Sequence, residues 1–136
     1  MDKKNVNIGI VGLGFMAVMH IRAYRQVKGA NIAAICNPSG NRLDGDFSDV
    51  FGNLDSGDPV KLDMSQVKPY QDFQELINDR SIDVIDICTP THTHLQLAKA
   101  ALASGKHVIC EKPLARTLED AKEISAAAKN AKGKFM

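Results

Sequence analysis

Short runs of apolar residues alternate along the chain with segments in which apolar residues recur every three to four positions. The first run, VNIGIVG at residues 6–12, is rich in β-branched residues and scarcely alternates with polar ones, which is typical of a strand buried on both faces. The next segment, residues 16–27, places Met16, Met19 and Ala23 on one helical face. The beginning of the chain therefore predicts a buried strand followed by an amphipathic helix.

The same alternation continues to the end of the chain. Further apolar runs predict strands at residues 31–36, 67–70, 82–88 and 107–110. The run at 67–70 contains Pro69, which suits a strand at a sheet edge. Helical patterns predict helices at 72–79, 95–105 and 118–131. Asp72 and Thr117 are expected to cap the starts of the first and the last, and Gly105 and Gly133 to close the second and the last.

Strands and helices in this rhythm indicate an α/β fold, a doubly wound parallel sheet of the Rossmann type with right-handed crossovers. The expected strand order is 3-2-1-4-5, and residues 1–136 are interpreted as one domain. Residues 41–66 depart from the pattern, because they are dense in Gly, Asp and Ser and have no sustained period. They predict a long surface loop with a short helical piece at most.

Composition narrows the range of partners. Seventeen basic and sixteen acidic side chains leave a formal charge of +1, without a basic cluster on any predicted face, so neither nucleic acid nor an anionic membrane is expected as a partner. No apolar segment has the length needed to cross a bilayer. Three cysteines without a Cys-x-x-Cys pair fit thiols in a reducing compartment, so we expect a cytoplasmic protein.

The stretch GLGFMA matches the dinucleotide-binding pattern G-x-G-x-x-G/A, and it lies between the first predicted strand and the first predicted helix. Gly12 would permit the tight turn, Gly14 would let a diphosphate approach the backbone, and Ala17 would let the helix pack on the strand. The amides at the helix start, at Phe15 and Met16, could then bind the diphosphate. The alternative is that these glycines only form a tight turn.

The second strand ends near residues that could choose the coenzyme. An acidic residue about 20 positions past the fingerprint would bind both ribose hydroxyls of NAD, but Asn37 stands there. Ser39, Asn41 and Arg42 follow, and Arg42 could bind the 2′-phosphate of NADP. These residues could equally cap a helix or face solvent, so both NAD and NADP remain open.

Two loops follow the fourth and fifth strands, TPTHTH at residues 89–94 and EKP at 111–113. Both are expected at the carboxyl end of the sheet, where ligands of this architecture bind. Lys112, which lies between Glu111 and Pro113 after the apolar run HVIC, is therefore a candidate for chemistry. Its alternative interpretation is a solvated lysine that merely follows a strand.

These blocks carry a family resemblance. GLGFMA, the NP after the second strand, DVIDICTPTHTHLQLAKAAL and GKHVICEKPLA together resemble the N-terminal domain of the glucose-fructose oxidoreductase, inositol dehydrogenase and rhizopine catabolism (Gfo/Idh/MocA) family. The resemblance covers essentially all of the chain, and the last two blocks are its most specific part. Members of that family oxidise a sugar or cyclitol hydroxyl, or reduce the corresponding carbonyl, with NAD(H) or NADP(H).

The resemblance implies roles for particular residues. Thr89, Pro90 and His94 would lie along the coenzyme, and Glu111 would lie near the nicotinamide ribose. Lys112 would point its ammonium at the reacting oxygen, where a cation stabilises developing alkoxide charge. The implied substrate is a small sugar or polyol.

The histidines of the TPTHTH loop admit other interpretations. His92 is taken as a candidate coenzyme contact beside His94, but Thr91 or Thr93 could cap a helix whose first turn carries two exposed histidines. Metal ligation by Cys88, His92, His94 and Cys110 is conceivable from their composition. Their spacing fits no standard zinc pattern, so no metal is expected.

The resemblance would continue past KGKFM into a sixth strand and a second, substrate-binding domain. We therefore expect the chain to be part of a longer oxidoreductase, inactive as a dehydrogenase alone and prone to form homo-oligomers through exposed apolar surface or a bare sheet edge. A nucleotide-sensing module without enzymatic activity is one rival hypothesis. A methyltransferase using S-adenosylmethionine is another, but it gives no account of the EKP sequence.

Overall fold

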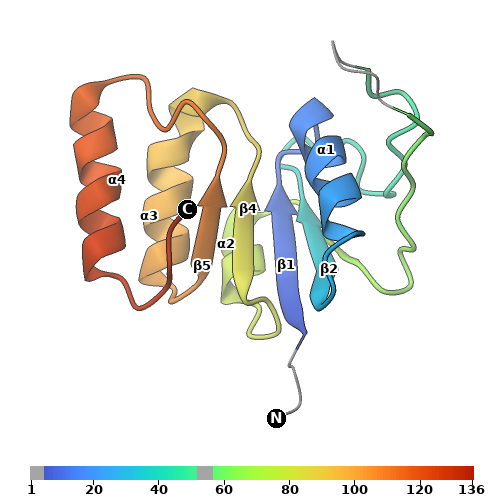
Figure 1. Ribbon diagram of the computed structural model, residues 1–136, viewed down its shortest axis with the longest axis horizontal. Helices are drawn as coiled ribbons and strands as arrows, with labels where there is room; N and C mark the ends of the chain where they lie inside the picture. The colour runs from blue at the N-terminus through green and yellow to red at the C-terminus, as the bar shows by residue number, and fades with distance from the viewer. Residues whose placement is uncertain (1–4, 52–56) are drawn as a thin grey trace.

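The computed structural model describes residues 5–51 and 57–136, which form a five-stranded parallel sheet in the order β3-β2-β1-β4-β5 (Figure 1). The sequence predicts the same order. The strands are β1 (Val6–Val11), β2 (Ala30–Cys36), β3 (Lys68–Tyr70), β4 (Val84–Ile87) and β5 (His107–Cys110). The helices are α1 (Phe15–Tyr24), α2 (Phe73–Asn78), α3 (His94–Ala103) and α4 (Leu118–Asn130), and the 3₁₀ helix η1 (Thr91–Thr93) precedes α3.

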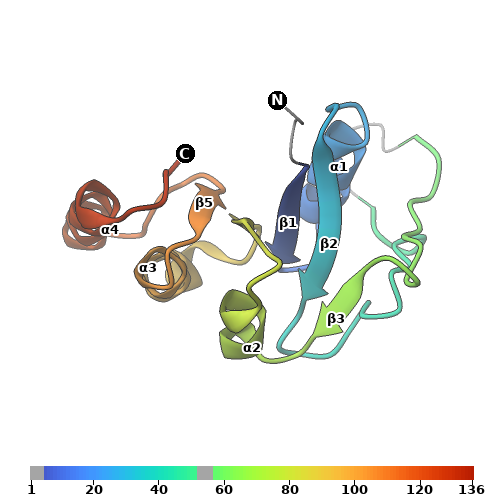
Figure 2. The same ribbon diagram turned by 90° about the horizontal axis from the view of Figure 1, so that it is seen from below.

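The sheet separates two apolar clusters, because successive side chains of a strand point to opposite faces. Ile10 of β1 packs with Ile21 of α1, whereas Val11 packs on the other face with Ile87 of β4 and Ala98 of α3. Helix α1 lies on one face, and α2 and α3 lie on the other (Figures 1 and 2). Each fully buried Ile or Val side chain contributes about 1.5–3 kcal/mol. Because all five strands are parallel, their carboxyl ends meet at one edge of the sheet, at the top of Figure 1.

Local signals place most helix boundaries. The predicted caps are confirmed, since the Asp72 side chain accepts from the Gln74 amide at 2.8 Å and Thr117 accepts from the Asp120 amide at 3.1 Å. Helix α1 ends at Tyr24 rather than at residue 27. Turn hydrogen bonds there lead the chain into β2, and this leaves Val27 exposed.

The predicted loop at residues 41–66 packs against the body of the protein. Phe47 and Val60 are each only 2% exposed, and the Phe47 amide donates to the Val60 carbonyl at 2.9 Å. Asp46 and Lys61 form an antiparallel bridge and an ion pair at 2.8 Å. No helix forms in the described part of this loop, and residues 52–56, which the prediction also covered, lie outside the described residues.

Gly133 has a different task from the predicted one. Helix α4 ends at Asn130, with Ala131 in extended backbone as its C-cap, so Gly133 does not close the helix. A Cβ at Gly133 would lie 2.0 Å from the Lys106 carbonyl oxygen. The glycine therefore lets the chain pass close to the loop before β5.

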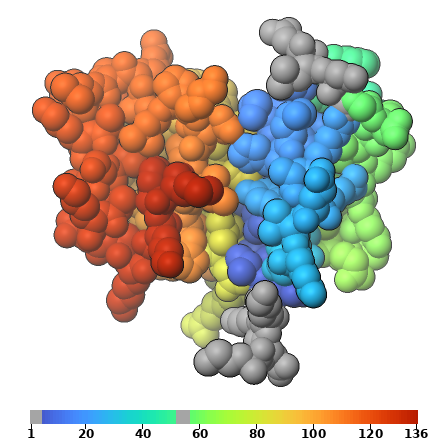
Figure 3. Space-filling view, in the orientation of Figure 1, coloured from blue at the N-terminus to red at the C-terminus, as the bar shows by residue number. Residues whose placement is uncertain are grey.

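The last residues extend the sheet beside β5. The Val108 amide donates to the Lys134 carbonyl at 2.8 Å, and the Met136 amide donates to the Val108 carbonyl at 2.9 Å. Phe135 and Val108 form a parallel bridge, so the expected bare edge at β5 is covered. In the space-filling view the end of the chain, in dark red, lies at the surface that faces the viewer (Figure 3). None of the helices in the described ranges has the length and apolar character needed to cross a membrane.

Candidate coenzyme-binding site

A cleft of about 680 Å³ opens at the carboxyl ends of β1, β2 and β4. Nine of the predicted coenzyme-binding residues line it: Gly12, Gly14, Phe15, Met16, Asn37, Ser39, Arg42, Thr89 and Pro90. Five others do not line it: Ala17, His92, His94, Glu111 and Lys112. The fold thus brings together residues from three loops that are far apart in the sequence.

Gly12 is required by the protein's own packing. Its φ is +85°, in the left-handed region that favours glycine. A Cβ there would lie 2.8 Å from the carbonyl carbon of Cys88 and 2.8 Å from the Thr89 amide nitrogen, and neither backbone atom could move aside easily. Gly12 therefore lets the turn after β1 pass against the loop after β4.

Packing within the protein does not require a glycine at position 14. Its backbone is extended, with φ −100° and ψ −159°, and a Cβ there would have no atom within 4 Å. It is the N-cap of α1, no side chain caps this helix start, and the first turn carries no acidic residue. The amides and the partial positive charge of the helix start are therefore directed at the cleft, where an anionic diphosphate fits. Ala17, fully buried one turn later, packs in the core.

The loop after β2 satisfies its own polar groups. The Asn37 side chain accepts from the Ser39 amide at 3.4 Å and donates to the Asn41 carbonyl at 2.8 Å. Arg42, with φ +60°, donates two hydrogen bonds to Asp49, at 3.1 and 2.9 Å. This pair raises the pKa of Arg42 and lowers the pKa of Asp49. The guanidinium at this rim of the cleft is thus already matched by a carboxylate.

The two histidines of the loop after β4 differ in their exposure to solvent. His92 is exposed, as the alternative interpretation expected, whereas His94 is 1% exposed. The Nε2 atom of His94 lies 2.9 Å from the Thr89 carbonyl oxygen, and its Nδ1 lies 3.1 Å from that of Pro113. His94 therefore ties the loop after β4 to the loop after β5. Neither η1 nor α3 has a side-chain cap, so neither Thr91 nor Thr93 caps a helix as the alternative interpretation had it.

Glu111 and Lys112 follow β5 directly. The Glu111 amide donates to the Ile87 carbonyl at 3.0 Å, and the Lys112–Pro113 peptide bond is cis. Lys112 is exposed, and within the described ranges its ammonium has no hydrogen bond or ion pair. Lys112 lies at the carboxyl end of the sheet, as expected, but it does not line the cleft that contains the glycine turn.

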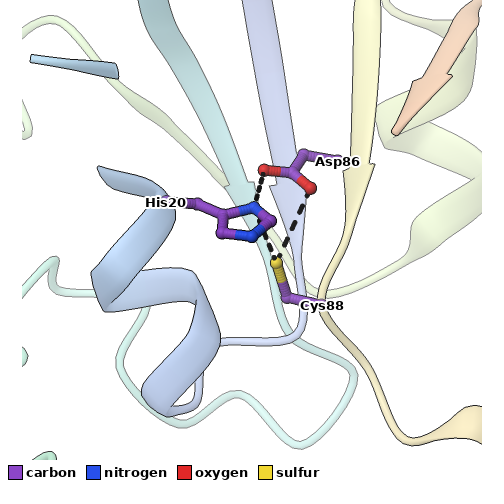
Figure 4. A group of neighbouring side chains, drawn as sticks. All are labelled: His20, Asp86 and Cys88. Atoms are coloured by element: carbon purple, nitrogen blue, oxygen red, sulfur yellow. Dashed lines mark hydrogen bonds and ion pairs between the residues drawn. The ribbon is translucent and has the colours of Figure 1, made fainter. Parts of the chain in front are cut away.

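A polar network next to this site was not predicted from the sequence. His20 of α1 lies between two carboxylates, with Nδ1 2.7 Å from Asp86 and Nε2 2.7 Å from Glu111. Asp86, fully buried in β4, also accepts from the Tyr24 hydroxyl at 2.6 Å, and Cys88 Sγ lies 3.6 Å from it (Figure 4). The hydrogen bond to Asp86 raises the pKa of His20. One signal was available, namely a carboxylate in the otherwise apolar run IDVIDIC.

The ligand-type atoms of His20, Asp86 and Cys88 lie within 4.8 Å of one another, which is close enough to surround an ion. They are already hydrogen-bonded to one another, and burial raises the pKa of the Cys88 thiol far above its usual range. We therefore treat this group as a hydrogen-bond network. Among the described residues, Cys88, His92, His94 and Cys110 form no such group.

A parallel sheet with a glycine turn opening onto a cleft at its carboxyl end defines a dinucleotide-binding domain of the Rossmann type. The sequence matches the family described as "Oxidoreductase family, NAD-binding Rossmann fold" over residues 6–136. The chain belongs to this family, the Gfo/Idh/MocA oxidoreductases, as the resemblance implied.

Several similar proteins are longer dehydrogenases. Levoglucosan dehydrogenase of Pseudarthrobacter phenanthrenivorans is 34% identical over 137 aligned positions, covering 93% of this chain and 31% of that protein. Inositol 2-dehydrogenase of Salmonella typhimurium is 34% identical, covering 91% and 34%. A crystal structure of an oxidoreductase from Agrobacterium radiobacter in complex with NAD+, L-tartaric acid and magnesium superposes with a TM-score of 0.79 at 32% identity, covering 98% and 35%. The chain thus spans about a third of the length of these relatives.

Proposed function

We propose that this chain is the coenzyme-binding part of an NAD-dependent dehydrogenase that acts on a hydroxyl group of a sugar or cyclitol, or on the corresponding carbonyl. The named relatives act on levoglucosan and inositol, and both are polyhydroxylated rings or close derivatives. The proposal rests on the helix start at Gly14, where an added Cβ would contact no other atom of the protein, so internal packing does not explain the glycine. An extended ligand that needs close approach to a helix start explains it.

Within the cleft, the amides at the start of α1 would hold the diphosphate, and the loop with Asn37 and Ser39 would face the adenosine ribose. We favour NAD over NADP, because Arg42 is paired with Asp49. A 2′-phosphate would have to displace that carboxylate or accept its repulsion. Thr89 and Pro90 would continue the binding surface toward the nicotinamide end.

Lys112 is proposed as the catalytic residue. When bound, the nicotinamide ring would supply or accept the hydride. A lysine ammonium beside the reacting oxygen would stabilise the negative charge that develops there as the hydride leaves or arrives. The exposed ammonium of Lys112, which has no partner among the described residues, is available for this role. His92, in the loop after β4, and Glu111, in the loop after β5, are proposed to contact the coenzyme. His94 is proposed to hold these two loops in place beside it.

The remaining parts of the proposal concern the complete protein. The expected setting is a cytoplasmic enzyme with a separate substrate-binding domain, which works as a homo-oligomer on a small polyol. The length of the relatives supports a further domain, and their names support an enzyme that acts on a small polyol.

The coenzyme proposal is tested by thermal melts of the chain with NADH, NADPH or S-adenosylmethionine, since a ligand that binds only the folded state raises the midpoint. NADH should raise it most. A rise with S-adenosylmethionine alone would refute the proposal in favour of a methyltransferase. For Lys112, the Lys112→Ala change should preserve the rise with NADH and abolish turnover in the complete enzyme. Unchanged function would support a sensing module.

A further inference from the structure

His20 lies in a position where both of its ring nitrogens face carboxylate oxygens. Nδ1 is 2.7 Å from Oδ2 of Asp86, and Nε2 is 2.7 Å from Oε1 of Glu111. A carboxylate oxygen only accepts hydrogen bonds, and a neutral imidazole has one N–H to donate. Both contacts are satisfied together when the ring carries two protons and hence a positive charge.

The surroundings favour this cation. Asp86 is fully buried, and His20 is the one cation-forming side chain that contacts it among the described residues. A buried carboxylate without a positive partner is strongly unfavourable, so Asp86 needs the charge of His20. The Tyr24 hydroxyl, 2.6 Å from Asp86, and the Cys88 thiol, 3.5 Å from His20 Nδ1, complete the groups that face the ring. Burial raises the pKa of both, so neither competes as an anion at neutral pH.

The other end of the network reaches the proposed catalytic loop. Oε1 of Glu111 faces His20, and Oε2 accepts from the backbone amide of Lys112 at 3.2 Å. Glu111 therefore links the ring of His20 in α1 to the peptide that carries Lys112. The same helix starts at the glycine turn, and Cys88 of the network lines the cleft.

We propose that His20 is a positioning residue, which as a cation held between Asp86 and Glu111 fixes the Glu111–Lys112 peptide at the carboxyl end of β5. The buried carboxylate of Asp86 anchors the ring, and the ring anchors Glu111. The orientation of the lysine is thereby coupled to the helix that begins at the coenzyme cradle. The inference rests on the proposed function only in treating Lys112 as the catalytic group.

The hydrogen-bond arrangement is testable in the chain itself by NMR of isotope-labelled protein. The ring nitrogens of His20 should show the signature of a doubly protonated imidazole at neutral pH. The amide signal of Lys112 should shift with pH in step with the ring of His20, with a midpoint above 6.5, the ordinary pKa of histidine. In His20→Gln this pH response of the Lys112 amide should vanish. His107→Gln, which removes a histidine at the other end of β5, is the matched control and should retain it.

The Glu111→Gln variant keeps the Asp86–His20 pair and decides the matter if His20→Gln does not fold. The midpoint of His20 should fall in this variant, because one of its two carboxylate partners loses its charge. A neutral ring of His20 at neutral pH would overturn the proposal. So would an unchanged midpoint in Glu111→Gln, or an unchanged response of the Lys112 amide in folded His20→Gln.

NADH-dependent stabilisation, measured on the same samples, separates this inference from the proposed function. Failure of NADH to stabilise the wild-type chain, with the His20 signals as expected, would count against the proposed function alone. Normal NADH binding without those signals would count against the role of His20 alone.

Discussion

The two glycines of the fingerprint should respond in opposite ways to the same substitution. Gly12 has φ +85°, and a Cβ there would lie 2.8 Å from backbone atoms of Cys88 and Thr89. Gly14 has extended backbone, and a Cβ there would meet nothing within 4 Å. Gly12→Ala should therefore damage the fold, whereas Gly14→Ala should damage only the binding of a ligand.

The cost of Gly12→Ala follows from two separate effects. The left-handed backbone costs a residue with a Cβ roughly 1–2 kcal/mol. Forcing a methyl group against immobile backbone costs about 1–3 kcal/mol more. A loss of about 2–5 kcal/mol is large beside a total stability of about 5–15 kcal/mol. At about 3 °C for each kcal/mol, the melting midpoint should fall by roughly 6–15 °C.

Gly14→Ala should leave the stability of the free chain within about 1 kcal/mol of the parent, because alanine restricts the unfolded chain but is a poorer N-cap residue than glycine. The new methyl group would occupy the space that a diphosphate needs. NADH at 100 times its Kd stabilises the parent chain by about 2.7 kcal/mol. If the Kd rises about 100-fold, the same concentration stabilises the variant by only about 0.4 kcal/mol.

Thermal and urea denaturation with and without NADH measure both effects. Gly105→Ala is the matched control, because Gly105 has φ +79° and open space around the added Cβ, so it isolates the backbone term of roughly 1–2 kcal/mol. A Gly14→Ala chain that loses as much stability without ligand as Gly12→Ala, or that keeps its full stabilisation by NADH, would refute the assignment of Gly14 to the ligand. A Gly12→Ala chain that melts like the parent would refute the packing argument.

Three further predictions concern the surrounding residues. Asp49→Asn frees the guanidinium of Arg42 to bind a 2′-phosphate. The Kd for NADPH, measured by fluorescence titration, should therefore fall by roughly tenfold relative to the Kd for NADH, which is about the effect of one charged hydrogen bond. An unchanged ratio of the two Kd values would show that Arg42 does not face the coenzyme. His94→Ala should cost about 2–4 kcal/mol in urea denaturation, because it removes a buried ring that joins two loops through its ring nitrogens. His92→Ala on the exposed side of the loop should cost less than about 0.5 kcal/mol. Equal costs would contradict the role of His94 in joining the two loops. The raised pKa of His20 adds stability that is fully present below pH 6.5 and is lost as the pH rises through the raised value. The free energy of unfolding should therefore fall as the pH rises above 6.5 in the parent and stay flatter in His20→Gln, and parallel curves would count against this reasoning.

The sequence by itself determined the features that depend on neighbours in the chain. β-Branched runs without alternation predicted strands buried on both faces, and their order in the sheet was confirmed. The caps at Asp72 and Thr117 were predictable because each bonds an amide only two or three residues away. The glycine turn was recognisable for the same reason, since its geometry is set within a few residues.

The tertiary structure alone decided the features that join distant segments. His20 and Glu111 are separated by 91 positions, and no periodicity relates them. Gly133 was predicted to close a helix, whereas in the structure it lets the chain pass close to Lys106. This close approach depends on how the chain returns to β5, so the local sequence does not reveal it. The burial of the His94 ring between the loops after β4 and β5 was not predictable, because these loops meet only when β4 and β5 are paired. Local patterns fix which elements form, because their hydrogen bonds are short-range, whereas burial and charge pairing arise only after folding has brought remote side chains together.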